Sequence, residues 1–246
     1  MVDFNPQYSR AGTQSAAQID EGLRAYMLTV YNYMASALAL TGLAAYVTAH
    51  TPAILSLFYA SNSAGMLAPT MLGYIAMFSP FAFILVINFG INKMQLSTTQ
   101  MIFWGFSVVM GISLSSVLLM YTGASVAKTF FVTAAAFGSL SLYGYTTKKN
   151  LSGMGSFLIM GLFGIIIAMI VNMFLQSSAM EFVISVAGVL IFAGLTAYDT
   201  QRIKLMYLEG EHSETASKKA IMGALSLYLD FINMFLFLLR FMGNRN

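Results

Sequence analysis

The stretch from Ala220 to Phe241, AIMGALSLYLDFINMFLFLLRF, decides what kind of protein this is. It is long enough to cross the hydrocarbon core of a bilayer, which takes about 20 apolar residues in a helix. At 1.5 Å per residue, Asp230 lies about 15 Å from the start of this helix, near the centre of a core about 30 Å thick. The stretch therefore predicts a transmembrane helix with a carboxyl group in its middle.

Six further stretches have the same apolar character, and the breaks between them are short. The chain is 58% hydrophobic and only 9% charged, whereas soluble domains carry about 25% charged residues. We therefore expect an all-α integral membrane protein, with a polar N-terminal tail over residues 1–24 and a seven-helix transmembrane domain over residues 25–246. The six further spans are predicted near residues 25–48, 70–91, 99–120, 129–147, 154–175 and 180–200.

Composition excludes several classes of function. The chain has no cysteine, which excludes disulfides, thiol catalysis and thiolate metal sites. Its net charge of +3 is small, so no nucleic-acid partner is indicated. Residues 1–23 are polar and lack the apolar core of a cleavable signal peptide. We expect the first span to remain in the protein and to direct its own insertion.

The lysines and arginines predict the orientation in the membrane, because they gather in cytoplasmic segments. With seven spans and a cytoplasmic N-terminus, nine of the twelve basic residues lie inside and three lie outside. We therefore predict a cytoplasmic N-terminus and a periplasmic C-terminus. The inside residues are Arg10, Arg24, Lys93, Lys148, Lys149, Arg202, Lys204, Lys218 and Lys219, and the outside ones are Lys128, Arg240 and Arg245.

A second carboxylate, Asp199, ends the sixth predicted span in the sequence LTAYDTQRIK. Because the sixth and seventh helices meet at the cytoplasmic side, Asp199 and Asp230 belong to the same half of the membrane. A charge at the bilayer centre costs roughly 3 kcal/mol, and two carboxylates in a dry site cannot both ionise cheaply. Such a pair would share a proton and act as a pH sensor. It would also offer oxygen ligands to Ca²⁺.

Simpler interpretations remain open for both residues. Asp199 could pair with Arg202, one helical turn later. Asp230 could be a structural hydrogen-bonding residue that fixes helix packing. Neither interpretation requires an ion pathway.

Two aspartates on adjacent spans also suggest an intramembrane aspartyl protease. Tyr198-Asp199 fits half of that pattern, but the other half, Gly-x-Gly-Asp, is replaced by Leu227-Tyr228-Leu229-Asp230. The chain contains neither His-Glu-x-x-His nor Gly-x-Ser-x-Gly. We predict that the protein is not an enzyme and needs no cofactor, with Ca²⁺ as a bound or transported ion only.

Three separated segments resemble the Bax inhibitor-1 (TMBIM) family in its bacterial branch. They are Ser141–Gly153 (SLYGYTTKKNLSG), Ala193–Lys204 (AGLTAYDTQRIK) and Ala224–Arg240 (ALSLYLDFINMFLFLLR). The resemblance implies six helices wrapped around a central seventh. It also implies a pH-sensitive calcium leak in the bacterial inner membrane, gated by protonation of Asp199 and Asp230.

Some bacterial relatives have a basic latch residue at the end of the second helix, which pairs with the sixth-helix aspartate. This chain has Ile91-Asn92-Lys93 there and no arginine. The resemblance therefore leaves Lys93 and Arg202 as the candidate latch partners of Asp199.

The sequence thus favours a calcium-leak channel whose partners are the lipid bilayer, Ca²⁺ and protons. The alternative is a non-channel regulator of a membrane protease, of another membrane protein or of a stress response. Such a regulator would make its contacts through the N-terminal tail and the EGEHSE loop at residues 209–214.

Overall fold

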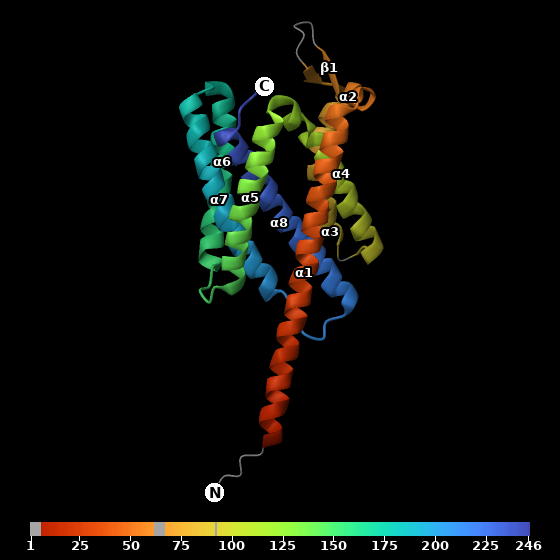
Figure 1. The fold of residues 1–246 in the computed structure, drawn as a ribbon, viewed down its shortest axis with the longest axis vertical. Coiled ribbons are helices and arrows are strands. Elements are labelled where there is room, and N and C mark those ends of the chain that lie inside the picture. The colour runs from red at the N-terminus through yellow and green to blue at the C-terminus, as the bar shows by residue number, and fades with distance from the viewer. Residues whose placement is uncertain (1–5, 62–66, 92) are drawn as a thin grey trace.

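The computed structural model describes residues 6–61, 67–91 and 93–246, with residues 6–20 described by their backbone only. Over these residues the chain forms a bundle of long helices with a small hairpin at one end (Figure 1). Seven helices are long and apolar enough to cross a membrane, which confirms the seven predicted spans. They are α1 (Pro6–His50), α3 (Met71–Gly90), α4 (Leu96–Met120), α5 (Gly123–Thr146), α6 (Ser152–Leu175), α7 (Ser178–Leu205) and α8 (Ser213–Met242).

The break between the first two spans contains regular secondary structure. It contains a short helix, α2 (Pro52–Phe58), and two antiparallel strands, β1 (Tyr59–Ser61) and β2 (Leu67–Pro69). Tyr59 is paired with Pro69, and Ser61 with Leu67. This unit covers one end of α1 and leads directly into α3.

Helix α8 is the centre of the bundle. In its most apolar window 67% of the residues are buried, against 11–33% in the other six spans. It packs against α1, α4, α5 and α7, while α3 packs on α4 and α6 packs on α7. A helix that is apolar on all sides is either buried in protein or exposed to lipid. Helix α8 is the buried case, and the predicted arrangement of six helices around a central seventh is confirmed.

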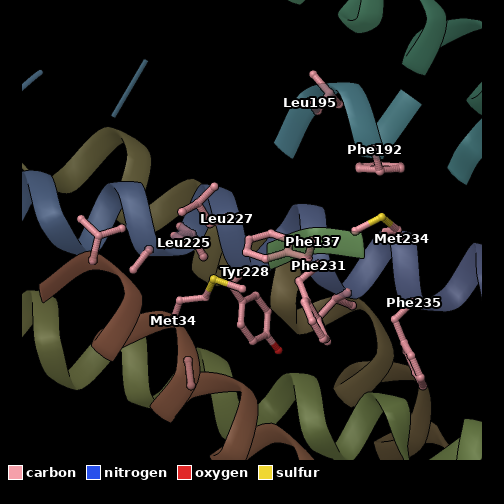
Figure 2. Close-up of a cluster of buried hydrophobic side chains, with 14 of the residues drawn as sticks. Met34, Phe137, Phe192, Leu195, Leu225, Leu227, Tyr228, Phe231, Met234 and Phe235 are labelled. Atoms are coloured by element: carbon pink, nitrogen blue, oxygen red, sulfur yellow. The ribbon is translucent and has the colours of Figure 1, made fainter. Parts of the chain in front are cut away.

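The core around α8 is built from large side chains (Figure 2). Leu227, Tyr228 and Met234 are fully buried. The Tyr228 hydroxyl lies 2.8 Å from Thr41 Oγ1, and Thr41 donates to the carbonyl of Ser107 at 2.9 Å. This chain of hydrogen bonds fixes α8 to α1 and α4, and it satisfies a phenol that burial would otherwise leave without a partner.

The two ends of the bundle differ in their connections. The end that we call the N-terminal side holds the turns at residues 93–95, 147–151 and 206–212 (Figure 1). The opposite end, the C-terminal side, holds the hairpin, the turns at 121–122 and 176–177, and the chain's C-terminus.

Helix α1 begins at Pro6, well inside the predicted polar tail, and projects beyond the bundle on the N-terminal side (Figure 1). Its membrane-spanning part is Glu21–His50. The tail of residues 1–24 is therefore helical over the part that the structure describes.

Candidate ion-binding site

Asp230 lies on the central helix and is only 5% exposed. Its Oδ2 atom is buried and has no hydrogen-bond partner within the described part of the chain. Leaving a buried polar atom without a partner costs about 1–3 kcal/mol, and more for a charged group. This carboxyl group therefore needs a proton, a cation or a water molecule to offset its burial.

Asp199 lies near the end of α7 and has a visible partner. Arg202 Nη1 is 3.6 Å from Asp199 Oδ1, one helical turn along the same helix. The Asp199 side chain is 14% exposed and that of Arg202 is 48% exposed. Half-exposed ion pairs of this kind contribute about 0–1 kcal/mol, so the contact can be broken at little cost.

The structure places the two aspartates near each other. Helices α7 and α8 pack along each other, and Asp199 and Arg202 are charged side chains in the neighbourhood of the Asp230 carboxyl group. Fully ionised, the three side chains would carry two negative charges and one positive charge. The group of Asp199, Arg202 and Asp230 is called the aspartate site below.

Lys93, the other candidate latch residue, is exposed in the turn after α3. It forms no ion pair with any residue that the structure describes. The sequence left open whether Lys93 or Arg202 pairs with Asp199. In the structure Arg202 makes this contact.

The end of α7 is held in place by hydrogen bonds that the sequence did not reveal. Thr200, the residue after Asp199, lies 3.0 Å from Ser141 Oγ on α5, and Ser141 Oγ lies 2.6 Å from the hydroxyl of Tyr31 on α1. Gln201 accepts from the amide of Leu151 at 2.9 Å. These contacts connect the aspartate site to α1, α5 and the α5–α6 turn.

Hydroxyl and amide side chains are common in transmembrane helices, so their presence alone did not mark Tyr31, Ser141, Thr200 or Gln201 as part of a site. Ser141 lies in the Ser141–Gly153 segment, and Thr200 and Gln201 lie in the Ala193–Lys204 segment, so the family resemblance of these segments is the one signal in the sequence that points to them.

A pocket of about 300 Å³ leads toward the aspartate site from the N-terminal side. Arg202 lines it, as does Ser226, which lies one turn before Asp230 on the same face of α8. At its mouth Lys218 pairs with Glu214 at 2.8 Å and Lys219 pairs with Glu211 at 2.6 Å. Because these lysines are neutralised, they oppose the entry of a cation only weakly.

Aromatic rings of α5 pack around Phe231, the residue that follows Asp230 on α8. Phe231 packs edge-to-face on Phe130 and on Phe137, with ring centroids 5.6 Å apart in both pairs. Phe137 and Phe231 lie near Tyr228, and Phe235 lies further along α8 (Figure 2). The structure thus has a pocket of about 300 Å³ on the N-terminal side of the aspartate site and a smaller pocket of about 120 Å³ beside the rings of Phe130 and Phe231.

The aspartate site offers few ligands to a divalent cation. Within the described residues, no three side chains of His, Cys, Asp or Glu lie close enough to hold a metal ion together. Ca²⁺ takes six to eight oxygen ligands. An ion at this site would bind the two carboxylates and would need water or hydroxyl oxygens for the rest, as a passing ion does.

Comparisons with known proteins agree with this architecture. A family model described as "Inhibitor of apoptosis-promoting Bax1" matches residues 23–246. The inner membrane protein YbhL of Escherichia coli K12 is 42% identical over 95% of this chain and 97% of its own length. The protein RP147 of Rickettsia prowazekii is 46% identical over 100% and 99%, and a protein of Caulobacter vibrioides is 46% identical over 99% and 98%.

Proposed function

Because the chain belongs to the Bax inhibitor-1 family, we propose that it is a pH-sensitive calcium leak of a bacterial inner membrane, gated by Asp199 and Asp230. One observation carries the proposal, namely the buried, unpartnered Oδ2 of Asp230 next to the Asp199–Arg202 ion pair. The name of the Escherichia coli relative supports the choice of membrane. The proposal assigns no catalytic step and no cofactor to the site.

The orientation proposed is a cytoplasmic N-terminal side and a periplasmic C-terminal side. It is supported by the basic residues, which gather on the N-terminal side in the turns and helix ends that the structure describes there. In this orientation the pocket beside Arg202 and Ser226 opens to the cytoplasm, and the rings around Phe231 face the periplasmic half.

Protonation would act on the ion pair first. A proton on Asp199 removes the negative partner of Arg202, and the half-exposed guanidinium is then free to turn toward water. The end of α7 loses one of its restraints, and α7 can move relative to α8. We therefore expect the calcium flux to increase as the pH falls.

The test is calcium flux into proteoliposomes from about pH 5 to about pH 8, the range in which a shared proton would exchange. The wild type should show a titration midpoint, and Asp199→Asn and Asp230→Asn should each remove it. Glu181→Gln, which removes a carboxylate on α7 that already pairs with Arg245, is the matched control and should keep the midpoint. Unchanged flux and midpoint in both aspartate variants would falsify the mechanism.

The second candidate is a non-channel regulator of a membrane protease, of another membrane protein or of a stress response. The projection of α1 beyond the bundle favours it, because an exposed helix is a ready contact surface (Figure 1). Deletion of residues 1–20 separates the two candidates. Flux that survives the deletion supports the leak, whereas absent flux in the full chain, together with cross-links from this segment to another membrane protein, supports the regulator.

A further inference from the structure

Helices α1 and α5 flank the central helix without packing closely on each other. Both pack on α8, which is visible between them in Figure 1. Along this seam lies a pocket of about 490 Å³ on the N-terminal side, formed by α1 and α5 alone and called the seam pocket below. Its lining residues are Arg24, Met27, Leu28, Tyr31, Phe137, Gly138, Ser141, Leu142 and Tyr145.

The seam pocket has the chemistry of an amphiphile site. Its wall is apolar over the part formed by Met27, Leu28, Phe137 and Leu142. From Arg24 to Tyr31 it extends about 10 Å along α1, which is about a third of a hydrocarbon core about 30 Å thick. Leu28 and Leu142 are exposed, so this wall faces the lipid of one leaflet.

The polar end of the seam pocket carries positive charge. Arg24 is exposed at its mouth on the N-terminal side. Lys204 lies nearby, because its Nζ donates to the carbonyl of Tyr145 at 2.7 Å and sits 4.9 Å from the centre of that ring. A carboxylate, Glu21, is one turn before Arg24. Cations at the end of an apolar groove complement a ligand with a phosphate head and a hydrocarbon tail.

Gly138 shows that the seam pocket is space that helix packing does not require. A Cβ atom built at Gly138 meets no atom within 4 Å, whereas one at Gly144, on the same helix, would collide with the backbone of Ala197. Gly144 is therefore needed for the approach of α5 to α7. Gly138 instead deepens the pocket.

We propose that the seam pocket binds one acyl chain of a membrane phospholipid, whose phosphate is held by Arg24. The inner end of this site is the Tyr31–Ser141–Thr200 chain of hydrogen bonds, which reaches the residue next to Asp199. The bound lipid would therefore touch the group that positions α7. The site does not depend on the proposed ion leak.

The experiment is native mass spectrometry of the full chain after delipidation in detergent, with phosphatidylglycerol or phosphatidylcholine added back. The wild type should retain one phospholipid and should prefer phosphatidylglycerol. Gly138→Leu fills the seam pocket and should reduce retention at least tenfold, and Arg24→Gln should weaken the preference for phosphatidylglycerol about fivefold.

Two matched glycines serve as controls, because a Cβ at either also meets no atom within 4 Å. Gly42→Leu enters a separate pocket nearer the C-terminal side, and Gly164→Leu lies on α6. Both should retain the lipid. If Gly138→Leu does not fold, a phospholipid with a photoreactive acyl chain should label Leu28 and Leu142 in the wild type.

Several results would overturn the proposal. They are no retained phospholipid in the wild type, equal retention in Gly138→Leu, or equal loss in all three leucine variants. Photolabelling that avoids both Leu28 and Leu142 would also contradict it. A dimer that forms without lipid and is lost in Gly138→Leu would instead identify the seam pocket as a self-association surface.

Discussion

At the scale of single residues, Asp230 is a buried acidic side chain on the central helix. The other large polar group on the buried part of α8, the Tyr228 hydroxyl, is 2.8 Å from Thr41 Oγ1, whereas Asp230 Oδ2 has no partner in the described chain. A residue that only fixed helix packing would be expected to use its oxygens for hydrogen bonds. The Oδ2 atom of Asp230 therefore does not fix helix packing through a hydrogen bond within the described chain.

The first prediction is that Asp230→Leu raises the thermal stability of the protein in detergent while it abolishes calcium flux. Replacing an unpartnered buried carboxyl with an apolar side chain of similar size removes a desolvation cost of about 1–3 kcal/mol. The change in thermal stability is measured by thermal unfolding, monitored by circular dichroism. A large loss of stability would support the interpretation that Asp230 is a structural hydrogen-bonding residue.

The second prediction separates the two latch candidates. Arg202→Gln removes the ion pair with Asp199 and should increase calcium flux at neutral pH, because Asp199 then lacks its restraint even when ionised. Lys93→Gln should behave as the wild type, since Lys93 is exposed and does not pair with Asp199 in the structure. Flux assays of both variants at the same pH decide it, and the reverse pattern would assign the latch to Lys93.

At the scale of elements, the contact between α5 and α7 positions the aspartate site. Gly144 allows the two backbones to approach near Ala197, and Lys204 donates to the carbonyl of Tyr145 at the end of the same interface. In lipid, where no hydrophobic force drives helices together, such close approach depends on small residues. The sequence showed glycines throughout the spans, and only the packing shows which of them is required.

The third prediction compares two glycines of α5. Gly144→Ala should destabilise the protein by about 1–3 kcal/mol, because the added methyl group overpacks a backbone contact. Gly138→Ala should be neutral or stabilising by up to about 1 kcal/mol, because it enters open space and raises helix propensity. Thermal unfolding of the two variants side by side measures the difference, and similar stabilities would contradict the inferred close contact.

At the scale of the whole molecule, the surroundings of Asp230 differ toward the two sides of the bundle. The pocket beside Arg202, lined partly by charged side chains, lies on the N-terminal side, and the apolar rings of Phe130, Phe137 and Phe231 pack together beside the residue that follows Asp230. For the proposed leak, this difference makes the orientation in the membrane a functional question as well as a topological one.

The fourth prediction concerns that orientation. Because the chain has no cysteine, single cysteines can be introduced without a background signal. In intact spheroplasts an impermeant maleimide should label Gln176→Cys, in the α6–α7 turn, but not Asn150→Cys, in the α5–α6 turn. After lysis both should react. Labelling of Asn150→Cys alone in intact spheroplasts would invert the topology and place the open pocket on the periplasmic side.

The central position of the last helix was implied by the family resemblance, whereas the sequence by itself determined the seven spans and the two aspartates. It could do so because hydrophobicity is a property of each residue, and a carboxylate within an apolar run is visible without knowing its neighbours. The observed helix limits differ from the predicted ones where polar residues extend a helix beyond its apolar stretch. Helix α8, for example, begins at Ser213, ahead of the predicted start near residue 220.

Only the tertiary structure decided which groups surround those aspartates. In the structure Asp199 pairs with Arg202 and not with Lys93, and Ser141 lies next to Thr200. Helices α1 and α5 stay apart and line a pocket. The physical reason is that pairing, close packing and empty space depend on which helix faces which. In a bundle where nearly every residue is apolar, that choice rests on shape and on a few hydrogen bonds, which no local pattern in the sequence encodes.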